Sequence, residues 1–393
     1  MSSAPYASFM QHAIALAAKA RWQTAPNPPV GAVVVHEGVI VAEGWHHGAG
    51  QAHAEVEAIN QAKERQIPLT ECTLVVTLEP CNHQGKTPPC TAAILEAKIP
   101  RVVIGVADIN PKATGGAKAL TDAGLDVIMG VEEQACRDLI DNFITWQTSD
   151  FPYTLIKLAC TLDGRIATRT GHSQWISCPE SREEVHCLRR HMDAVIIGAK
   201  TFYDDNPKLT CRLPDISVAP DQQPLAVIVS SRLPESNASY HLLNERPHQT
   251  MFWTTVASAA SPKAEALRKL GVTIVGLPAS NTHGGRAGRH GAKLDLHDGM
   301  VLLRKEFNCH HVLCEGGGKL ALSLLQGRLA HELHLHISPK IMADNDAIAL
   351  FDGLCPDTVD EALQLRFTHV TRNECDILAT LKFRETPKED QGL

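Results

Sequence analysis

The feature that most constrains this chain is a restart of its apolar pattern at Ser149-Asp150-Phe151-Pro152. Before this point, short β-branched runs alternate with amphipathic helical stretches, and the same alternation begins again after it. The chain has 393 residues, whereas a single hydrophobic core rarely grows beyond about 250 to 300 residues. We therefore predict two α/β domains, residues 1–148 and 149–393.

The first series opens with an amphipathic helix and then follows a β-β-α-β-α-β-α-β order, which favours a mixed sheet with helices on both faces. Its predicted strands are residues 30–35, 39–43, 73–77, 101–106 and 126–129, and its helices begin near residues 53, 91 and 117. The second series also alternates, which predicts crossover connections between strands. Its predicted strands are residues 153–159, 194–198, 225–229, 251–255, 272–275 and 311–314, and its helices are 179–190, 262–270 and 319–325.

Composition excludes several classes of protein. With 44% hydrophobic and 21% charged residues the chain is globular, and a net charge of −7 disfavours nonspecific binding to nucleic acid. No run of about 18 apolar residues occurs, so we expect no membrane partner. The 12 cysteines are spread through apolar and helical contexts, which indicates a reducing cytoplasm rather than a disulfide framework.

One motif in the first half carries metal chemistry. His53 opens a predicted helix, and Cys81 and Cys90 flank the start of the next one. An imidazole and two thiolates suit Zn²⁺ and leave the fourth position for water, which is typical of catalytic zinc sites. Glu55 lies two residues beyond His53, so it is badly placed as a ligand but can reach that water as a proton carrier. We predict a zinc deaminase with one Zn²⁺ per chain held by His53, Cys81 and Cys90, although the usual Pro-Cys-x-x-Cys spacing is here eight residues long.

Late in the second half, a predicted strand runs into Glu315-Gly316-Gly317-Gly318-Lys319 and then into a helix. Backbone N–H groups at such a turn can bind a pyrophosphate. The segment is not Gly-x-Gly-x-x-Gly and lies late in its domain, so it does not predict a Rossmann fold. A glycine-rich connection without a ligand explains the pattern equally well.

Longer motifs in both halves resemble the bifunctional deaminase/reductases of riboflavin biosynthesis. In the first half they are Asn27-Pro28-Pro29-Val30-Gly31, Glu43-Gly44-Trp45-His46, His53-Ala54-Glu55-Val56, Thr77-Leu78-Glu79-Pro80 and the insert between Cys81 and Cys90. In the second half they are Phe151-Pro152-Tyr153, residues 157–167, 171–176 and 205–212, and Glu315-Gly316-Gly317. The resemblance implies a cytidine-deaminase-like α/β/α sandwich followed by a dihydrofolate-reductase-like α/β domain that uses NADPH.

The resemblance also implies the residues of both sites. Substrate contacts in the first half are Asn27, His46, His83 and Lys86, with Glu55 catalytic. Substrate contacts in the second half are Ser173, Arg189, Leu209, Arg212 and Glu315. Cofactor contacts are Ala159, Trp175, Thr201, Asp205, Ser231, Gly317, Gly318, Lys319, Leu320, Ala321, Leu322 and Ser323. The chain departs from the family pattern at Ile109, at Thr114–Ala117, at Thr161 and at Ser230.

The expected activity is hydrolytic deamination of 2,5-diamino-6-ribosylamino-4(3H)-pyrimidinone 5′-phosphate, followed by reduction of the ribosyl side chain with NADPH. The enzyme is expected to be a cytoplasmic homo-oligomer with no nucleic-acid partner. One alternative is a nucleic-acid base deaminase fused to an unrelated reductase, which the absence of a basic stripe disfavours. Another is a zinc-stabilised binding module with an inactive cofactor fold, which would not need Glu55. The polar loop 281–293 is assigned no function.

Overall fold

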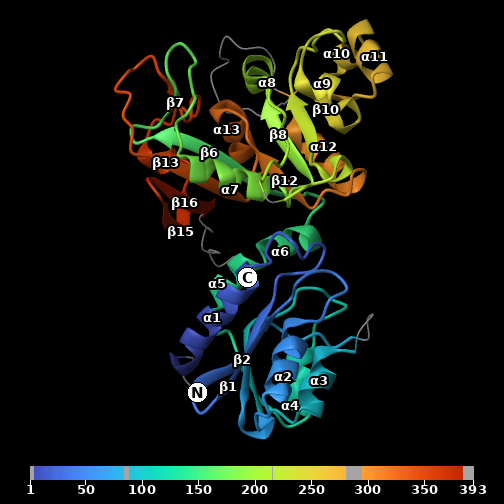
Figure 1. Cartoon of the computed structure of the whole chain (residues 1–393), viewed down its shortest axis with the longest axis vertical. Helices are drawn as coiled ribbons and strands as arrows, with labels where there is room; N and C mark the ends of the chain where they lie inside the picture. Colours follow the sequence, from blue (N-terminus) through green and yellow to red (C-terminus); the bar gives the residue numbers. More distant parts are fainter. Residues whose placement is uncertain (1–3, 84–87, 215, 280–293, 384–393) are drawn as a thin grey trace, which may run out of the picture. The chain divides into compact units, whose positions relative to one another are not determined.

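The computed structural model describes residues 4–83, 88–214, 216–279 and 294–383. The chain divides into two compact units, Met1–Ser149 and Asp150–Leu393, each with its own sheet (Figure 1). Within the described ranges, no helix has both the length and the apolar character needed to cross a membrane.

The sheet of the first unit begins with a hairpin. Strand β1 (Gly31–His36) pairs antiparallel with β2 (Val39–Trp45) through the turn Glu37-Gly38, where both residues have positive φ as a tight two-residue turn requires. Strand β1 also pairs antiparallel with β3, after which the sheet continues in parallel, in the order β2-β1-β3-β4-β5. The parallel strands are β3 (Thr73–Leu78), β4 (Arg101–Val106) and β5 (Asp126–Met129).

Helices cover both faces of this sheet, as the sequence predicts (Figure 1). One face carries α2 (Ala54–Glu64), α3 (Cys90–Glu96) and α4 (Gly116–Asp122), and the other carries α1 (Ala7–Ala18) and α5 (Glu133–Leu139). Helix α2 lies so close to β2 that a Cβ atom on Gly44 would stand 2.6 Å from the Ala54 carbonyl oxygen. Helix α5 and the following α6 (Asp141–Thr148) are absent from the predicted order because they are short and carry little apolar periodicity.

The second unit contains a nine-stranded sheet in the order β11-β10-β9-β8-β12-β6-β13-β16-β15. Its strands are β6 (Tyr153–Thr161), β8 (Ala194–Gly198), β9 (Leu225–Val229), β10 (Thr250–Thr255), β11 (Thr273–Leu277), β12 (His311–Cys314), β13 (Glu332–Ser338), β15 (Leu365–Asn373) and β16 (Asp376–Phe383). Pairing is parallel from β11 to β13 and antiparallel for β16 and β15. A separate two-stranded sheet joins β7 (Arg165–Ala167) to β14 (Ile348–Ala349).

The sequence predicted six of these strands and missed β13, β15 and β16. Strand β13 alternates glutamate, histidine and serine with apolar residues, so it lacks the continuous β-branched run by which the other parallel strands were recognised. Strand β15 carries mostly exposed or half-exposed side chains and has only a weak apolar signal.

Seven helices lie among the described residues of the second unit, and two of them contribute to a hydrophobic core with the sheet. The seven helices are α7 (Pro179–Arg189), α8 (Ala199–Asp205), α9 (His241–Asn244), α10 (Val256–Ala259), α11 (Pro262–Lys269), α12 (Leu296–Lys305) and α13 (Gly318–Gln326). Short 3-10 helices lie at Pro220–Gln222, Pro247–Gln249 and Val359–Glu361 in this unit, and at Ala4–Tyr6 and Leu69–Glu71 in the first unit. Residues of α12 and α13 share a core with Ile156 and Leu158 of β6, so Lys157 between them faces the opposite side of the sheet.

Candidate functional site

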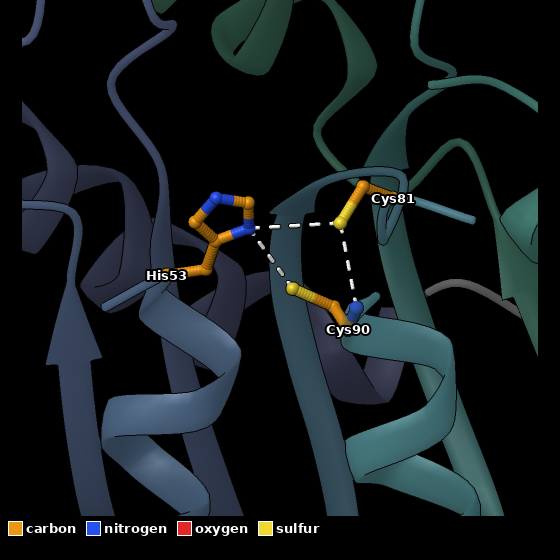
Figure 2. Close-up of side chains that lie close together, drawn as sticks. All are labelled: His53, Cys81 and Cys90. Atoms are coloured by element: carbon orange, nitrogen blue, oxygen red, sulfur yellow. Dashed lines mark hydrogen bonds between the residues drawn. The ribbon is translucent and has the colours of Figure 1, made fainter. Parts of the chain in front are cut away.

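Three predicted metal ligands meet at the ends of secondary-structure elements in the first unit. His53 is the N-cap residue of α2, Cys81 lies on the loop after β3, and Cys90 begins α3. Figure 2 shows the imidazole facing both sulfur atoms: His53 Nδ1 is 3.1 Å from Cys90 Sγ and 3.6 Å from Cys81 Sγ. All three donor atoms lie within 4.8 Å of one another. One nitrogen and two sulfur donors at this spacing fit a tetrahedral zinc ion with an open fourth position.

The electrostatics of this triad already favour a thiolate. A hydrogen bond from the Cys90 thiol, together with the His53 imidazole and the Cys90 backbone N–H, lowers the pKa of Cys81 to about 4. The contact with Cys81 raises the pKa of the Cys90 thiol and also raises the pKa of His53. A cation at the centre would release the remaining protons, because zinc binds deprotonated thiols and neutral imidazole.

Glu55 lies in the first turn of α2, one residue beyond the N-terminal residue of that helix. Its side chain is buried, with 4% of the residue exposed. Burial raises the pKa of the Glu55 carboxyl group, against the opposing attraction of His53. A carboxyl group that is neither a zinc donor nor exposed to bulk water is suited to accept and return a proton.

Two predicted substrate residues form one hydrogen-bonded pair beside the triad. Asn27 Nδ2 is 3.1 Å from His46 Nε2, and His46 Nδ1 is 3.0 Å from the Ala52 carbonyl oxygen. Burial lowers the pKa of His46, which favours the neutral imidazole. Because Nδ1 donates to Ala52, Nε2 accepts from the Asn27 amide, which leaves Asn27 Oδ1 as an acceptor for another molecule. His83 is exposed, and Lys86 lies outside the described residues.

The loop that departs from the family pattern is held by a residue that the sequence analysis did not assign. The buried Glu79 carboxylate accepts hydrogen bonds from the backbone N–H groups of Asp108 at 3.0 Å, Gly115 at 3.1 Å and Ala117 at 2.9 Å. These bonds fix the chain from residue 108 to 117 against Pro80, so the loop keeps a defined position despite Ile109 and the altered residues 114–117. The available signal was an acidic residue directly after a mostly apolar, buried strand.

In the second unit, two predicted substrate residues bind each other. Arg189 at the end of α7 forms a bidentate ion pair with Glu315 at the end of β12, with both N···O distances 2.6 Å. The two side chains are only 11% and 14% exposed. Arg189 also donates to the Thr210 carbonyl oxygen at 3.1 Å, so most of its hydrogen-bonding capacity is already used.

Further cations interact with the Arg189–Glu315 pair. Arg212 is exposed and donates to Thr210 Oγ1 at 2.8 Å, and its pKa is lowered by burial and then by Arg189. Burial and then Arg189 also lower the pKa of Arg246, to about 10. Lys157 on β6 has its pKa lowered by burial, with Glu315 opposing. Lys157 and Arg246 are not among the site residues predicted from the sequence; the signal for Lys157 was a lysine within an apolar strand. An excess of positive charge here suits an anion such as a phosphate.

The glycine-rich segment approaches its surroundings closely at two positions. A Cβ atom on Gly318 would stand 1.7 Å from the Leu350 carbonyl oxygen, and one on Gly316 would stand 2.7 Å from Leu320 Cδ2, whereas Gly317 faces open space. No side chain caps α13, so its first N–H groups can meet a phosphate. Leu320 and Ala321 are buried in the core, and Ser323 Oγ donates to the Lys319 carbonyl oxygen, so this segment can reach a ligand mainly through backbone.

The other predicted cofactor residues lie on several elements. Thr201 and Asp205 belong to α8, Ala159 is half-buried on β6, and Trp175 is 61% exposed with the Arg182 guanidinium 4.5 Å from its ring centre. Ser231 borders a cavity of about 630 Å³. Its polar lining includes Tyr203, Ser231, Arg232, Glu235, Ser258, Ser261 and Lys263, and the last of these forms an ion pair with Glu235. The Arg232 guanidinium and several hydroxyl groups in one cavity suit a phosphate monoester.

Comparison with known proteins matches both units. The model of the cytidine and deoxycytidylate deaminase zinc-binding region matches residues 4–106, and the model of the RibD C-terminal domain matches residues 152–379. The riboflavin biosynthesis protein RibD of Aquifex aeolicus is 38% identical over 360 residues, covering 91% of this chain and 93% of that protein. The chain belongs to the RibD family.

Solved RibD structures extend over the whole chain. The diaminohydroxyphosphoribosylaminopyrimidine deaminase/5-amino-6-(5-phosphoribosylamino)uracil reductase of Thermotoga maritima is 34% identical with a TM-score of 0.73, covering 97% of this chain and 99% of that one. Acinetobacter baumannii RibD is 31% identical with a TM-score of 0.71, covering 98% of this chain and 100% of that one. These matches confirm the expected fold class, and they decide against a deaminase fused to an unrelated reductase.

Membership in the RibD family also confirms the expected activity class. The chain is a bifunctional deaminase and reductase of riboflavin biosynthesis that uses Zn²⁺ and NADPH. At two positions where the chain departs from the RibD pattern, the side chain present still forms a hydrogen bond to the backbone. Thr161 Oγ1 accepts the Arg165 N–H at 2.9 Å, and Ser230 Oγ accepts the Arg232 N–H at 3.2 Å, so each hydroxyl group holds the turn that follows its strand.

Proposed function

We propose that the first unit deaminates 2,5-diamino-6-ribosylamino-4(3H)-pyrimidinone 5′-phosphate and that the second reduces the ribosyl group of the product to a ribityl chain. The observation that carries the deaminase assignment is the convergence of His53, Cys81 and Cys90, with the buried Glu55 two residues along the same helix. A purely structural metal would not require that carboxyl group.

In the deaminase unit, each residue has a role that follows from its chemistry. His53, Cys81 and Cys90 would hold the zinc ion, whose chemistry when bound is to acidify a water molecule. The buried Glu55 carboxyl group would accept a proton beside this site and return it to the departing amino group. Asn27 Oδ1 accepts a hydrogen bond from the pyrimidine edge, because His46 holds the amide nitrogen. His83 and Lys86 complete the proposed substrate contacts, with Lys86 on the phosphate.

In the reductase unit, the chain binds and orients while NADPH supplies the hydride. The pyrophosphate would lie on the first turn of α13, and Ala159, Trp175, Thr201 and Asp205 would contact the rest of the cofactor. Arg212 is the better-placed phosphate ligand of the two predicted arginines, since it is exposed and Arg189 is held by Glu315. Arg189 and Glu315 then shape the substrate pocket together with Ser173 and Leu209.

The remaining expectations belong to the same proposal. We assign deamination to residues 1–148 and reduction to residues 149–393, supported by the division of the structure after Ser149. Assembly as a homo-oligomer, independence from nucleic acid and a cytoplasmic location are likewise proposed.

The metal assignment is tested with Cys81→Ser in the full-length chain. We expect zinc at the triad to be lost and deamination to fail, while reduction of deaminated substrate with NADPH continues. The matched control is Cys72→Ser, whose buried thiol donates to the Pro68 carbonyl oxygen and lies outside the triad. A zinc content in Cys81→Ser equal to that of the unaltered chain, measured by elemental analysis, would remove Cys81 from the ligand set.

A further inference from the structure

A second cluster of metal-binding side chains lies in the reductase unit and contains none of the site residues assigned above. Cys178 is the N-cap residue of α7, and Cys375 and Asp376 lie where β15 turns into β16. The two sulfur atoms and a carboxylate oxygen lie within 4.8 Å of one another. Cys178 and Asp376 are buried, whereas Cys375 is exposed and opens the cluster to solvent.

The carboxylate of this cluster is oriented by the helix that it faces. Asp376 Oδ2 accepts hydrogen bonds from the Cys178 N–H and from Ser181 Oγ, both at 2.8 Å. This leaves Oδ1 turned toward Cys375 Sγ, 3.8 Å away. Outer hydrogen bonds of this kind typically hold a ligating carboxylate in position.

The same carboxylate forms no direct ion pair in the part of the chain that the structure describes. Asp376 is 1% exposed, and Lys157 and His336, the two basic side chains that act on it electrostatically, lie beyond ion-pair distance. A buried carboxylate without a direct counterion is costly, so a cation bound at this cluster would offset part of that cost.

The spacing of the donor atoms fits a tetrahedral cation better than a covalent bond between the thiols. Zinc bonds of about 2.3 Å to sulfur and about 2.1 Å to oxygen place sulfur and oxygen ligands about 3.6 Å apart. The Cys375 Sγ to Asp376 Oδ1 distance is 3.8 Å, and Cys178 Sγ lies 3.6 Å from the Asn373 carbonyl oxygen. A disulfide would instead require the two sulfur atoms to approach to about 2.05 Å, beside an acidic group that disfavours thiolate attack.

We propose that Cys178 Sγ, Cys375 Sγ and Asp376 Oδ1 bind a second zinc ion, with the Asn373 carbonyl oxygen or a water in the fourth position. On binding, the two thiols release two protons and two S–Zn bonds form, with no change of oxidation state. The ion ties the N-terminus of α7 to the β15–β16 hairpin. Since α7 ends at Arg189, it also steadies the helix that carries the Arg189–Glu315 pair.

The test compares zinc content in full-length variants after dialysis against buffered zinc and gel filtration. We expect the Cys375→Ser variant to hold one zinc equivalent fewer than the unaltered chain, with Cys178→Ser giving the same loss. The matched control is Cys355→Ser, which removes another exposed cysteine that belongs to no cluster in the described chain and should lose nothing. Cobalt substitution should show sulfur-to-metal charge-transfer absorption that decreases in the Cys375→Ser variant.

Equal zinc content in the unaltered chain and in both cysteine variants would overturn the proposal. Detection of a Cys178–Cys375 linked peptide in metal-exposed protein, by mass spectrometry under nonreducing conditions, would also overturn it and indicate a redox pair. Cys81→Ser is measured in parallel, so failure of the deaminase zinc site and failure of this second site give different results. Deaminase activity should remain in the Cys375→Ser variant, because the first unit and its zinc ligands are unchanged.

Discussion

The two units build their sites in different ways. In the deaminase unit, the three proposed zinc donors lie within residues 53–90, two at the start of a helix and one on the loop after a strand, and a local pattern predicts them. In the reductase unit, the charged residues of the site come from separate elements: Lys157 from β6, Arg189 from α7 and Glu315 from the end of β12. Arg189 and Glu315 form an ion pair with each other. The difference teaches that a site defined by short spacing can be predicted from sequence, whereas a dispersed site also carries part of the fold.

The largest expected effect comes from a substitution that abolishes proton transfer in the deaminase site without changing the fold. Glu55→Gln keeps the buried shape but cannot accept a proton, so we expect deamination to fall by about 10²- to 10⁴-fold. Zinc content should stay unchanged because Glu55 is not a donor in the triad. Steady-state kinetics with the diaminopyrimidine phosphate measures the effect. Near-normal turnover in this variant would contradict the proton-transfer role.

The equivalent change in the reductase unit should act on stability as well as activity. Glu315→Ala leaves the Arg189 guanidinium buried without its carboxylate, which typically costs about 3–5 kcal/mol. We expect the calorimetric transition of this unit to move to lower temperature, and a second substitution, Arg189→Met, to recover part of the loss. Glu306→Ala, an exposed glutamate on the same unit, serves as the control and should change little. Equal stability of Glu315→Ala and Glu306→Ala would mean that the pair is dispensable for folding.

This contrast also explains what the sequence could and could not predict. The zinc triad, Glu55 and most strands of both sheets follow from local patterns, because apolar runs and ligand spacing are properties of neighbouring residues. Strand β13 was missed because its buried face is polar, and the Arg189–Glu315 pair was missed because residues 126 positions apart meet only in the folded chain. Lys157 was not predicted as a site residue for the same reason, because the charged residues that it interacts with lie on other elements and meet it only in the folded chain.

A smaller effect concerns the polar face of β13, which has no counterpart in the deaminase sheet. His336 is fully buried, and neither ring nitrogen has a hydrogen-bond partner in the described structure. Burial, and then Lys157 and His334, lower its pKa from 6.5 to about 3. Below about pH 6.5 the unfolded chain therefore binds a proton that the folded chain does not, so stability falls as the pH falls.

The size of this pH dependence follows from the single proton that the unfolded chain binds at His336 and the folded chain does not. Between pH 6 and pH 4, His336 alone should reduce the free energy of unfolding by about 1.4 kcal/mol for each pH unit. His336→Leu should remove this part of the slope, whereas His297→Leu at an exposed position should keep it. Thermal unfolding measured across this pH range decides the matter, and identical slopes for His336→Leu and the unaltered chain would exclude His336 as the source.

The smallest expected effect concerns coenzyme choice, where the reductase unit relies on exposed side chains alone. Ser231 and Arg232 follow β9 and line a cavity that also contains Lys263. A hydroxyl and a guanidinium suit the 2′-phosphate that distinguishes NADPH from NADH. Replacing both with alanine should preserve the turn, because Ser230 Oγ binds the backbone N–H of Arg232 and not its side chain.

We expect the Ser231→Ala/Arg232→Ala variant to raise the Michaelis constant for NADPH by about tenfold, since hydrogen bonds to charged groups contribute about 1.5–3 kcal/mol and exposure reduces this. The constant for NADH should hardly change, because NADH has no phosphate at this position. Lys263→Ala should act in the same direction, and Lys269→Ala on the same helix, outside the cavity, is the matched control. If both Michaelis constants rise together, or if neither moves, the 2′-phosphate binds elsewhere and the cavity serves another part of the cofactor.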